Sequence, residues 1–121
     1  MSQVPRYAAN LTFLFGEVPF LERFGAARRA GFRAVELVSP YEHPPGEVAA
    51  AARDAGVEVV LFNLPAGDWA KGDRGMACDP SRAAEFRDGA ARALEYARAL
   101  GCTRLHTMAG IRPPGVPEPA L

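Results

Sequence analysis

The feature that most constrains the fold of this chain is a junction that occurs three times. At 30–32, 55–57 and 100–102 a small or apolar residue is followed by Gly and then by the start of an apolar segment. Glycine readily adopts the left-handed conformation in which a helix ends and the chain turns back. The repetition predicts alternating strands and helices, joined by right-handed crossovers into a parallel sheet.

Hydrophobic spacing places the elements between these junctions. We expect strands over 6–11, 33–38, 57–63 and 103–109. We expect helices over 17–30 and 47–55, the second with Pro45 in its first turn, and a third helix capped by Ser81 and ended by Gly101. The buried stripe of that third helix is predicted to be Phe86, Ala90, Ala93, Leu94 and Ala97.

Two α/β architectures fit this pattern, an open doubly wound sheet and part of a (β/α)8 barrel. The turn after the first expected strand lacks the G-x-G-x-x-G signature of a dinucleotide fold, which favours the barrel. A complete barrel takes about 250 residues, so we expect 1–121 to form the N-terminal half of a TIM barrel, about four β/α units of a longer protein. Residues 110–121, which carry four prolines, are expected to form a loose tail.

Composition excludes several classes of protein. The chain has 49% hydrophobic residues and a formal net charge of zero, which disfavours a disordered chain and a nucleic-acid-binding or membrane-surface protein. Its apolar runs are short and no secretory signal begins the sequence, so we expect no membrane span and a cytoplasmic location. Cys78 and Cys102 match no zinc motif, and we expect both to be free thiols.

Polar residues interrupt all four expected strands. Asn10 and Asn63 end the first and third strands, while Glu36 and His106 lie within the second and fourth. Ligands of parallel α/β proteins bind beyond the carboxyl ends of the strands, so these four residues are candidates for a pocket. The competing interpretations are a loop-bonding Asn10, a turn-forming Asn63, an ion-paired Glu36 and a hydrogen-bonded core His106.

Two loops on the same side of the expected sheet add further candidates. In the turn after the second strand, Tyr41 is a candidate donor to a substrate oxygen, while Glu42 and His43 fit a solvated, proline-shaped turn better. The long loop after Asn63 carries a cluster of charged and aromatic residues, comprising Asp68, Trp69, Lys71, Asp73 and Arg74. Such a loop is suited to close over an anionic substrate with Lys71 or Arg74, or to be a wet surface loop anchored by Trp69.

Four segments resemble the hydroxypyruvate isomerases of the xylose-isomerase-like barrel superfamily. They are 8–15 (AANLTFLF), 34–42 (AVELVSPYE), 60–75 (VLFNLPAGDWAKGDRG) and 93–110 (ALEYARALGCTRLHTMAG). The resemblance covers nearly the whole chain and is most specific in the Asn-x-Pro-x-Gly-Asp loop and the His-x-Met-Ala-Gly strand end. It implies interconversion of hydroxypyruvate and 2-hydroxy-3-oxopropanoate through an enediolate.

The resemblance also implies how the site is divided between the two halves of the barrel. The catalytic glutamates and the ligands of a divalent metal in the full-length enzyme are expected beyond Leu121. This chain is then expected to hold no catalytic residue and no metal, and to be inactive alone. It is expected to contribute to a pocket for a small hydroxy or keto acid with Asn10, Glu36, Tyr41, Asn63, Asp68 and His106.

Two other functions stay open at this stage. One is a sugar epimerase, isomerase or dehydratase of the same superfamily, because substrate choice depends on loops outside this chain. The other is a non-catalytic module that binds a small acid, or that pairs with another chain through the free edges of its sheet. Fold alone does not choose among them.

Overall fold

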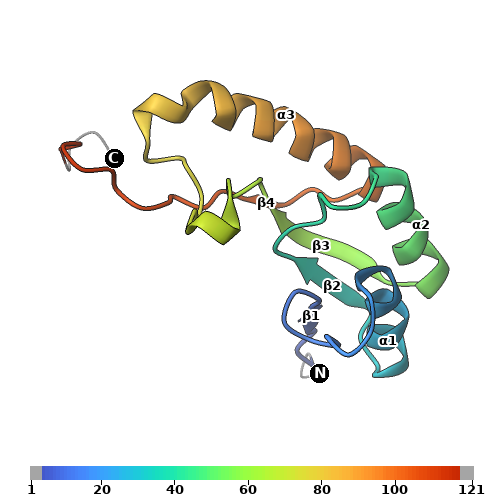
Figure 1. Cartoon of the computed structure of the whole chain (residues 1–121). Helices are drawn as coiled ribbons and strands as arrows, with labels where there is room; N and C mark the ends of the chain where they lie inside the picture. Colours follow the sequence, from blue (N-terminus) through green and yellow to red (C-terminus); the bar gives the residue numbers. More distant parts are fainter. Residues whose placement is uncertain (1–3, 118–121) are drawn as a thin grey trace.

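The computed structural model describes residues 4–117 and contains one parallel sheet in the order β1-β2-β3-β4. Its strands are β1 (Ala8–Asn10), β2 (Ala34–Leu37), β3 (Glu58–Asn63) and β4 (Leu105–His106). The connecting helices α1 (Arg23–Arg29), α2 (Pro45–Ala55) and α3 (Ala83–Leu100) lie side by side along the sheet (Figure 1). This arrangement confirms the expected half of a (β/α)8 barrel.

One face of the sheet is packed against the helices. The strand residues on this face are at most 2% exposed and comprise Ala9, Val35, Leu37, Val59 and Phe62. They are covered by buried residues of the three helices, which are Phe24 and Ala27 of α1, Val48 and Ala52 of α2, and Ala93, Tyr96 and Ala97 of α3. Removal of this apolar surface from water is the main force that holds the described chain together.

Left-handed glycines end the helices as the sequence predicts. Gly56 and Gly101 follow α2 and α3 with φ of 73° and 64°, and each lets the next amide bond back to the last helical turn. Residues with a Cβ rarely adopt this conformation. Pro45 occupies the first turn of α2, also as predicted.

Several predicted boundaries are wrong. The first helix begins only at Arg23, after a 3-10 turn at Phe20–Glu22, because Pro19 has no amide hydrogen to donate and disfavours helical geometry in the residue before it. The strand expected over 103–109 is limited to Leu105–His106. Its partner β3 ends at Asn63, and Pro65 cannot donate to a continued ladder.

The start of α3 also differs from the prediction. Asp79, rather than Ser81, is the capping side chain: its carboxylate accepts from the Ser81 amide at 3.0 Å and caps a 3-10 turn at Pro80–Arg82. The α-helix then begins at Ala83 without a side-chain cap. Leu94, expected in the buried stripe, is 48% exposed, and Tyr96 takes its place in the core.

The remaining expectations concern the end of the chain and its thiols. Residues 111–117 form no helix or strand, and residues 118–121 of the expected loose tail lie outside the described residues. Cys78 and Cys102 are free, with Cys102 buried. Within residues 4–117 no helix is long and apolar enough to cross a membrane.

Candidate functional site

The second face of the sheet carries the predicted polar residues. Asn10 pairs with Glu36 in the β1–β2 register, Glu36 with Leu61, and Asn63 with His106. Alternate residues of a strand point to the same side, so Leu61 and Asn63 share a face. We call Asn10, Glu36, Leu61, Asn63 and His106 the open face, because the described helices cover only the opposite side.

A register irregularity preserves this arrangement. Val35 pairs with Val59 but Glu36 pairs with Leu61, which leaves Val60 as an extra residue in β3. An extra residue in one strand shifts which side chains face each way. As a result Phe62 joins the helix-covered face, while Asn63 stands on the open face with Glu36.

Asn10 and Glu36 form a hydrogen-bonded pair between β1 and β2 on the open face. The Asn10 Nδ2 donates to Glu36 Oε1 at 3.2 Å, and the Asn10 Oδ1 accepts from the Thr12 amide at 2.9 Å. Asn10 therefore performs the local loop bonding considered above and also orients the carboxylate. Glu36 is half-buried, and the side chain that binds it is an amide rather than a cation. Within residues 4–117, no ion pair includes its carboxylate.

Asn63 and His106 stand next to each other at the carboxyl ends of β3 and β4. His106 is exposed and Asn63 is half-buried, so the interpretation of His106 as a core residue does not hold within residues 4–117. The backbone continues the pairing for one residue, with the Leu64 amide donating to the His106 carbonyl at 2.9 Å. Both side chains are accessible to a ligand on the open face.

Tyr41 lies on the other side of the sheet. Its ring makes edge contacts with Phe62 and Tyr96, whose centroids are 6.4 and 5.0 Å away, and its hydroxyl donates to the Asn63 carbonyl. Burial raises the pKa of Tyr41 well above its usual range, so the phenol stays protonated and keeps this bond at neutral pH. The geometry makes Tyr41 a support for the end of β3 instead of a member of the open face.

A groove of about 430 Å³ lies where the loops after β1, β2 and β3 meet. The lining residues are Thr12, Phe13, Phe20, Arg23, Val38, Ser39, Glu42, His43, Ala66 and Trp69. His43 stacks on Phe20 with ring centroids 5.4 Å apart. We call this the mouth groove, because loops at the carboxyl ends of barrel strands form the mouth of a TIM barrel.

The mouth groove changes the assessment of several residues. Glu42 and His43, which the sequence favoured as a solvated turn, both line it. Arg23 was not singled out from the sequence; its guanidinium donates to the carbonyls of Val18 and Leu11 and brings a positive charge to the groove. Thr12 and Ser39 could have been predicted as groove residues, because they come directly after the first two expected strands.

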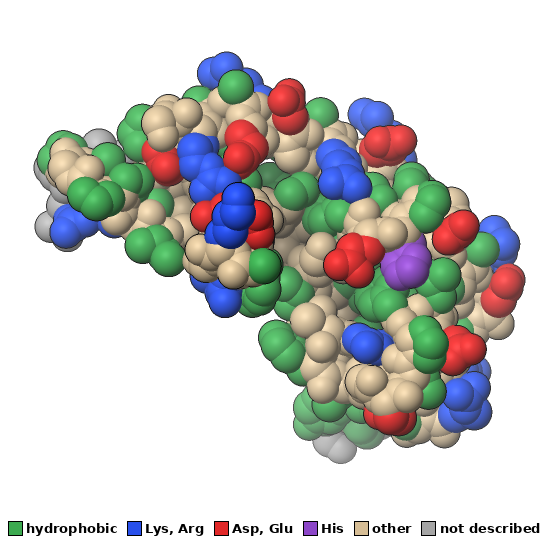
Figure 2. Space-filling view, viewed as in Figure 1, with side chains coloured by type: hydrophobic (Ala, Val, Ile, Leu, Met, Phe, Trp, Pro, Cys, Tyr) green, Lys and Arg blue, Asp and Glu red, His purple; other side chains and the backbone are tan. Residues whose placement is uncertain are grey.

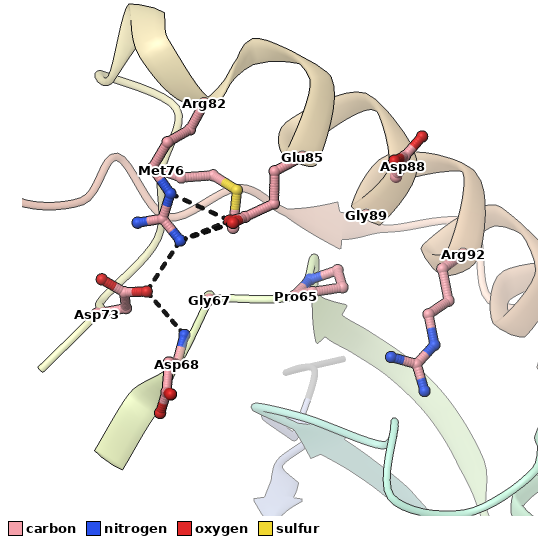
Figure 3. A pocket seen from close by; sticks show the side chains of 10 residues that line it. All are labelled: Pro65, Gly67, Asp68, Asp73, Met76, Arg82, Glu85, Asp88, Gly89 and Arg92. Carbon is pink, nitrogen blue, oxygen red and sulfur yellow. Dashed lines mark hydrogen bonds and ion pairs between the residues drawn. The ribbon is translucent and has the colours of Figure 1, made fainter. Parts of the chain in front are cut away.

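Asp68 lies apart from the open face and the mouth groove. It caps the 3-10 turn Trp69–Lys71 and lines a second hollow of about 350 Å³ between the loop after β3 and α3 (Figure 3). Lys71 is exposed and pairs with Asp68 at 3.8 Å, while the Arg74 guanidinium stacks 3.6 Å from the Trp69 ring center. The structure therefore uses these two cations within the loop itself.

Charge and metal-ligating groups restrict the chemistry of the described part of the chain. Figure 2 shows acidic and basic side chains interspersed over the visible face, in keeping with the formal net charge of zero. Among residues 4–117 no three His, Cys, Asp or Glu side chains cluster closely enough to hold a metal ion. The described residues do not form a complete metal site by themselves, and the resemblance places the ligands of a divalent metal beyond Leu121.

Comparison with known proteins identifies the family. The model of the xylose isomerase-like TIM barrel matches residues 24–121, most of the chain. The chain belongs to this family. A crystal structure of a family 2 AP endonuclease from Brucella melitensis superimposes on 97% of this barrel half with a TM-score of 0.92 and 49% identity, and the match covers 45% of that protein.

Two similar proteins are named as isomerases. This xylose isomerase-like chain is 50% identical to the 2-oxo-tetronate isomerase of Cupriavidus necator and 49% identical to the hydroxypyruvate isomerase of Escherichia coli, each over 110 residues. These matches cover 91% of the chain but 42% and 43% of the relatives. The chain thus spans less than half the length of these two enzymes.

Proposed function

We propose that this chain is the N-terminal half of an isomerase that acts on a small hydroxy-oxo acid. The observation that carries the proposal is sequence identity. Over nine-tenths of the chain, about half of the matched residues are identical to those of two isomerases. The geometry supports it, since the open face gathers an amide, a carboxylate and an imidazole at the carboxyl ends of parallel strands. Those groups suit a small polar substrate.

The proposed reaction interconverts hydroxypyruvate and 2-hydroxy-3-oxopropanoate. A base removes a proton from C3 of hydroxypyruvate, and the electron pair forms the C2–C3 double bond of an enediolate while the C2 carbonyl becomes an oxyanion. The C2 oxygen gains a proton and the C3 hydroxyl loses one, and protonation of C2 then leaves a hydroxyl at C2 and the aldehyde at C3. Such steps need a positioned base and donors at the developing oxyanion. The open face offers donors from Asn10, Asn63 and His106 to the substrate oxygens.

Arg23 supports an acidic substrate. A guanidinium has five N–H groups, and two of its nitrogens donate to backbone carbonyls at 2.9 and 3.0 Å. The remaining N–H groups are available to bond the carboxylate of the substrate in the mouth groove. The net charge of zero also favours a small molecule over a nucleic acid.

The rest of the machinery is assigned to a second half of the barrel. We place the catalytic carboxylates and the ligands of a divalent metal there. The uncovered edges of β1 and β4 are the places where further parallel strands would pair to close the barrel. Pairing with a second copy of the chain at these edges is the alternative.

A four-carbon 2-oxo acid is the second candidate substrate, favoured by the 50% identity with the 2-oxo-tetronate isomerase. A sugar epimerase or dehydratase of the same family, or a module that binds an acid without turnover, would also use this fold. The acid that is consumed separates the three-carbon from the four-carbon substrate, and binding without turnover would indicate a non-catalytic module.

The experiment joins this chain to the part of the Escherichia coli hydroxypyruvate isomerase that lies beyond the matched region; we call the product the joined protein. Proton NMR in deuterium oxide follows hydroxypyruvate and 2-oxo-tetronate. We expect turnover with solvent deuterium incorporated at the reacting carbon by the joined protein, and none by the 121-residue chain. A folded joined protein that binds but does not convert either acid would overturn the proposal.

A further inference from the structure

Arg82 connects the start of α3 to the loop after β3. Its Nη2 lies 2.9 Å from Asp73 Oδ2 and 2.5 Å from Glu85 Oε2, and its Nε lies 3.0 Å from the same Glu85 oxygen (Figure 3). The side chains of Arg82 and Asp73 are only 25% and 28% exposed. One guanidinium thus binds a carboxylate of its own helical turn and a carboxylate of the loop.

Asp73 passes this connection to the other side of the loop. Its Oδ2 also accepts from the Asp68 amide at 2.7 Å, and its amide donates to the Asp68 carbonyl at 3.0 Å. Gly67 has a φ of 89°, and a Cβ there would lie 2.8 Å from Arg82 Nη2. The backbone at Gly67 therefore approaches the ion pair more closely than any other residue type allows.

The loop held in this way presents an aromatic residue to the mouth groove. Between Asp68 and Asp73 the chain forms the 3-10 turn Trp69–Lys71, and Trp69 lines the groove while remaining 48% exposed. Arg74 stacks on the Trp69 ring and donates to the Trp69 carbonyl at 3.1 Å. Trp69 lies outside α1–α3 and β1–β4, so its position depends on the conformation of the loop.

We propose that Arg82 is a positioning residue, which clamps Asp73 and thereby holds residues 66–74 in the conformation that places Trp69 in the wall of the mouth groove. The inference rests on the proposed function in one respect, that the groove receives the substrate. Arg82 itself lines the hollow behind the loop and does not line the groove. It acts on the groove only through Asp73 and the loop.

The chemistry of the clamp favours arginine at this position. A planar guanidinium presents several N–H groups in fixed directions and can bind two carboxylates together, whereas an ammonium is a point charge. The hydrogen bonds from Arg82 and from the Asp68 amide lower the pKa of Asp73, so the carboxylate is charged throughout the neutral range. Lys71 adds to this effect, and Glu85 shares the guanidinium.

The sequence supplies two probes inside the loop. Trp69 is the only tryptophan and Lys71 the only lysine of the 121 residues, so tryptophan emission and cleavage by endoproteinase Lys-C both report on the loop alone. Cleavage of a folded chain requires local opening. For Arg82→Gln we expect a faster cut after Lys71 by about fivefold, the scale of losing a partly exposed ion pair, and a red shift of Trp69 emission.

Matched variants separate the clamp from a general weakening of α3. Arg87→Gln removes an exposed cation from the same helix and is expected to change neither probe. Asp73→Asn is expected to reproduce Arg82→Gln, and the double variant to be no worse than either single one, because both break the Arg82–Asp73 pair through which the clamp acts on the loop. Unchanged cleavage in Arg82→Gln, or full additivity in the double variant, would overturn the proposal.

A kinetic measurement in the joined protein connects the clamp to substrate. Arg82→Gln is expected to raise KM by about fivefold with little change in kcat, as for lost uniform binding, while Arg87→Gln changes neither. If the joined protein is inactive but the loop probes respond as expected, the proposed function fails and the clamp stands. Circular dichroism shows whether the 121-residue chain is folded. If it is not, cleavage after Lys71 is measured in the joined protein by mass spectrometry of the products. The same results then support or overturn the proposal.

Discussion

The two faces of the sheet differ in what completes them. On the helix-covered face, Phe62, Val35 and Val59 are buried by residues of this same chain. On the open face, Glu36 and Asn63 are half-buried and His106 is exposed, although Val35 and Phe62, directly before Glu36 and Asn63 in the same strands, have no exposure. The covered face is a finished core, and we infer that the open face is half of a barrel interior.

This difference teaches that a sequence can encode stability and function on alternate residues of the same strands. The covered face contains only apolar residues, and no polar side chain within residues 4–117 is fully buried. The polar groups are confined to the open face, where Asn10 orients Glu36 at 3.2 Å. Substitutions on the two faces should therefore change different measured quantities.

The largest expected effect is on the covered face. Phe62→Ala removes a fully buried ring between β3 and the helices, and it should lower the free energy of unfolding by about 3–5 kcal/mol. Urea denaturation followed by circular dichroism measures the change. A loss below about 1 kcal/mol would show that the covered face is not the core that holds the sheet together.

Leu61→Ala is the matched control one residue away on the open face. Leu61 is partly exposed in this chain, so the same truncation should cost much less than Phe62→Ala. In the joined protein the cost should increase, because the second half of the barrel would bury Leu61. Equal costs in the two proteins would contradict the assignment of this face to a barrel interior.

A smaller effect is expected at Tyr41, which connects the two faces through the Asn63 carbonyl. Tyr41→Phe removes the hydroxyl and should lower stability by about 1 kcal/mol. Because burial raises the pKa of Tyr41, its contribution is fully present below the usual tyrosine pKa of about 10 and is lost as pH rises toward the higher folded value. Stability between pH 7 and pH 11 should fall less steeply in Tyr41→Phe than in the unchanged chain.

Local signals in the sequence were sufficient for the order of the strands. The Gly after each helix and the apolar runs of the strands depend on the backbone and on near neighbours, and they predicted β1-β2-β3-β4. Boundaries that depend on partners were wrong. The length of β4 is set by where β3 ends. Ahead of α3, the capping side chain is Asp79, which caps the 3-10 turn Pro80–Arg82, rather than the Ser81 that the sequence favoured.

The site was predictable only where it lies in the strands. The alternation of side chains along the strands places four predicted residues on the open face, namely Asn10, Glu36, Asn63 and His106. None of these four lines the mouth groove. Tyr41 and Asp68 were expected beside them, but their positions follow from long-range contacts with Tyr96 and with the Arg82 clamp. The convergence of Arg23, at the start of α1, with Trp69, in the loop after β3, depends on tertiary structure and could not be inferred from the spacing of residues in the sequence.

The central claim is that the open face forms one wall of the substrate site. The direct test is Glu36→Gln and His106→Asn in the joined protein, with kinetics and thermal unfolding measured on the same samples. We expect each to lower kcat/KM by a factor of ten or more, about 1.4 kcal/mol, with an unchanged melting temperature. A lower melting temperature with unchanged kcat/KM would contradict the claim, and would make both residues structural.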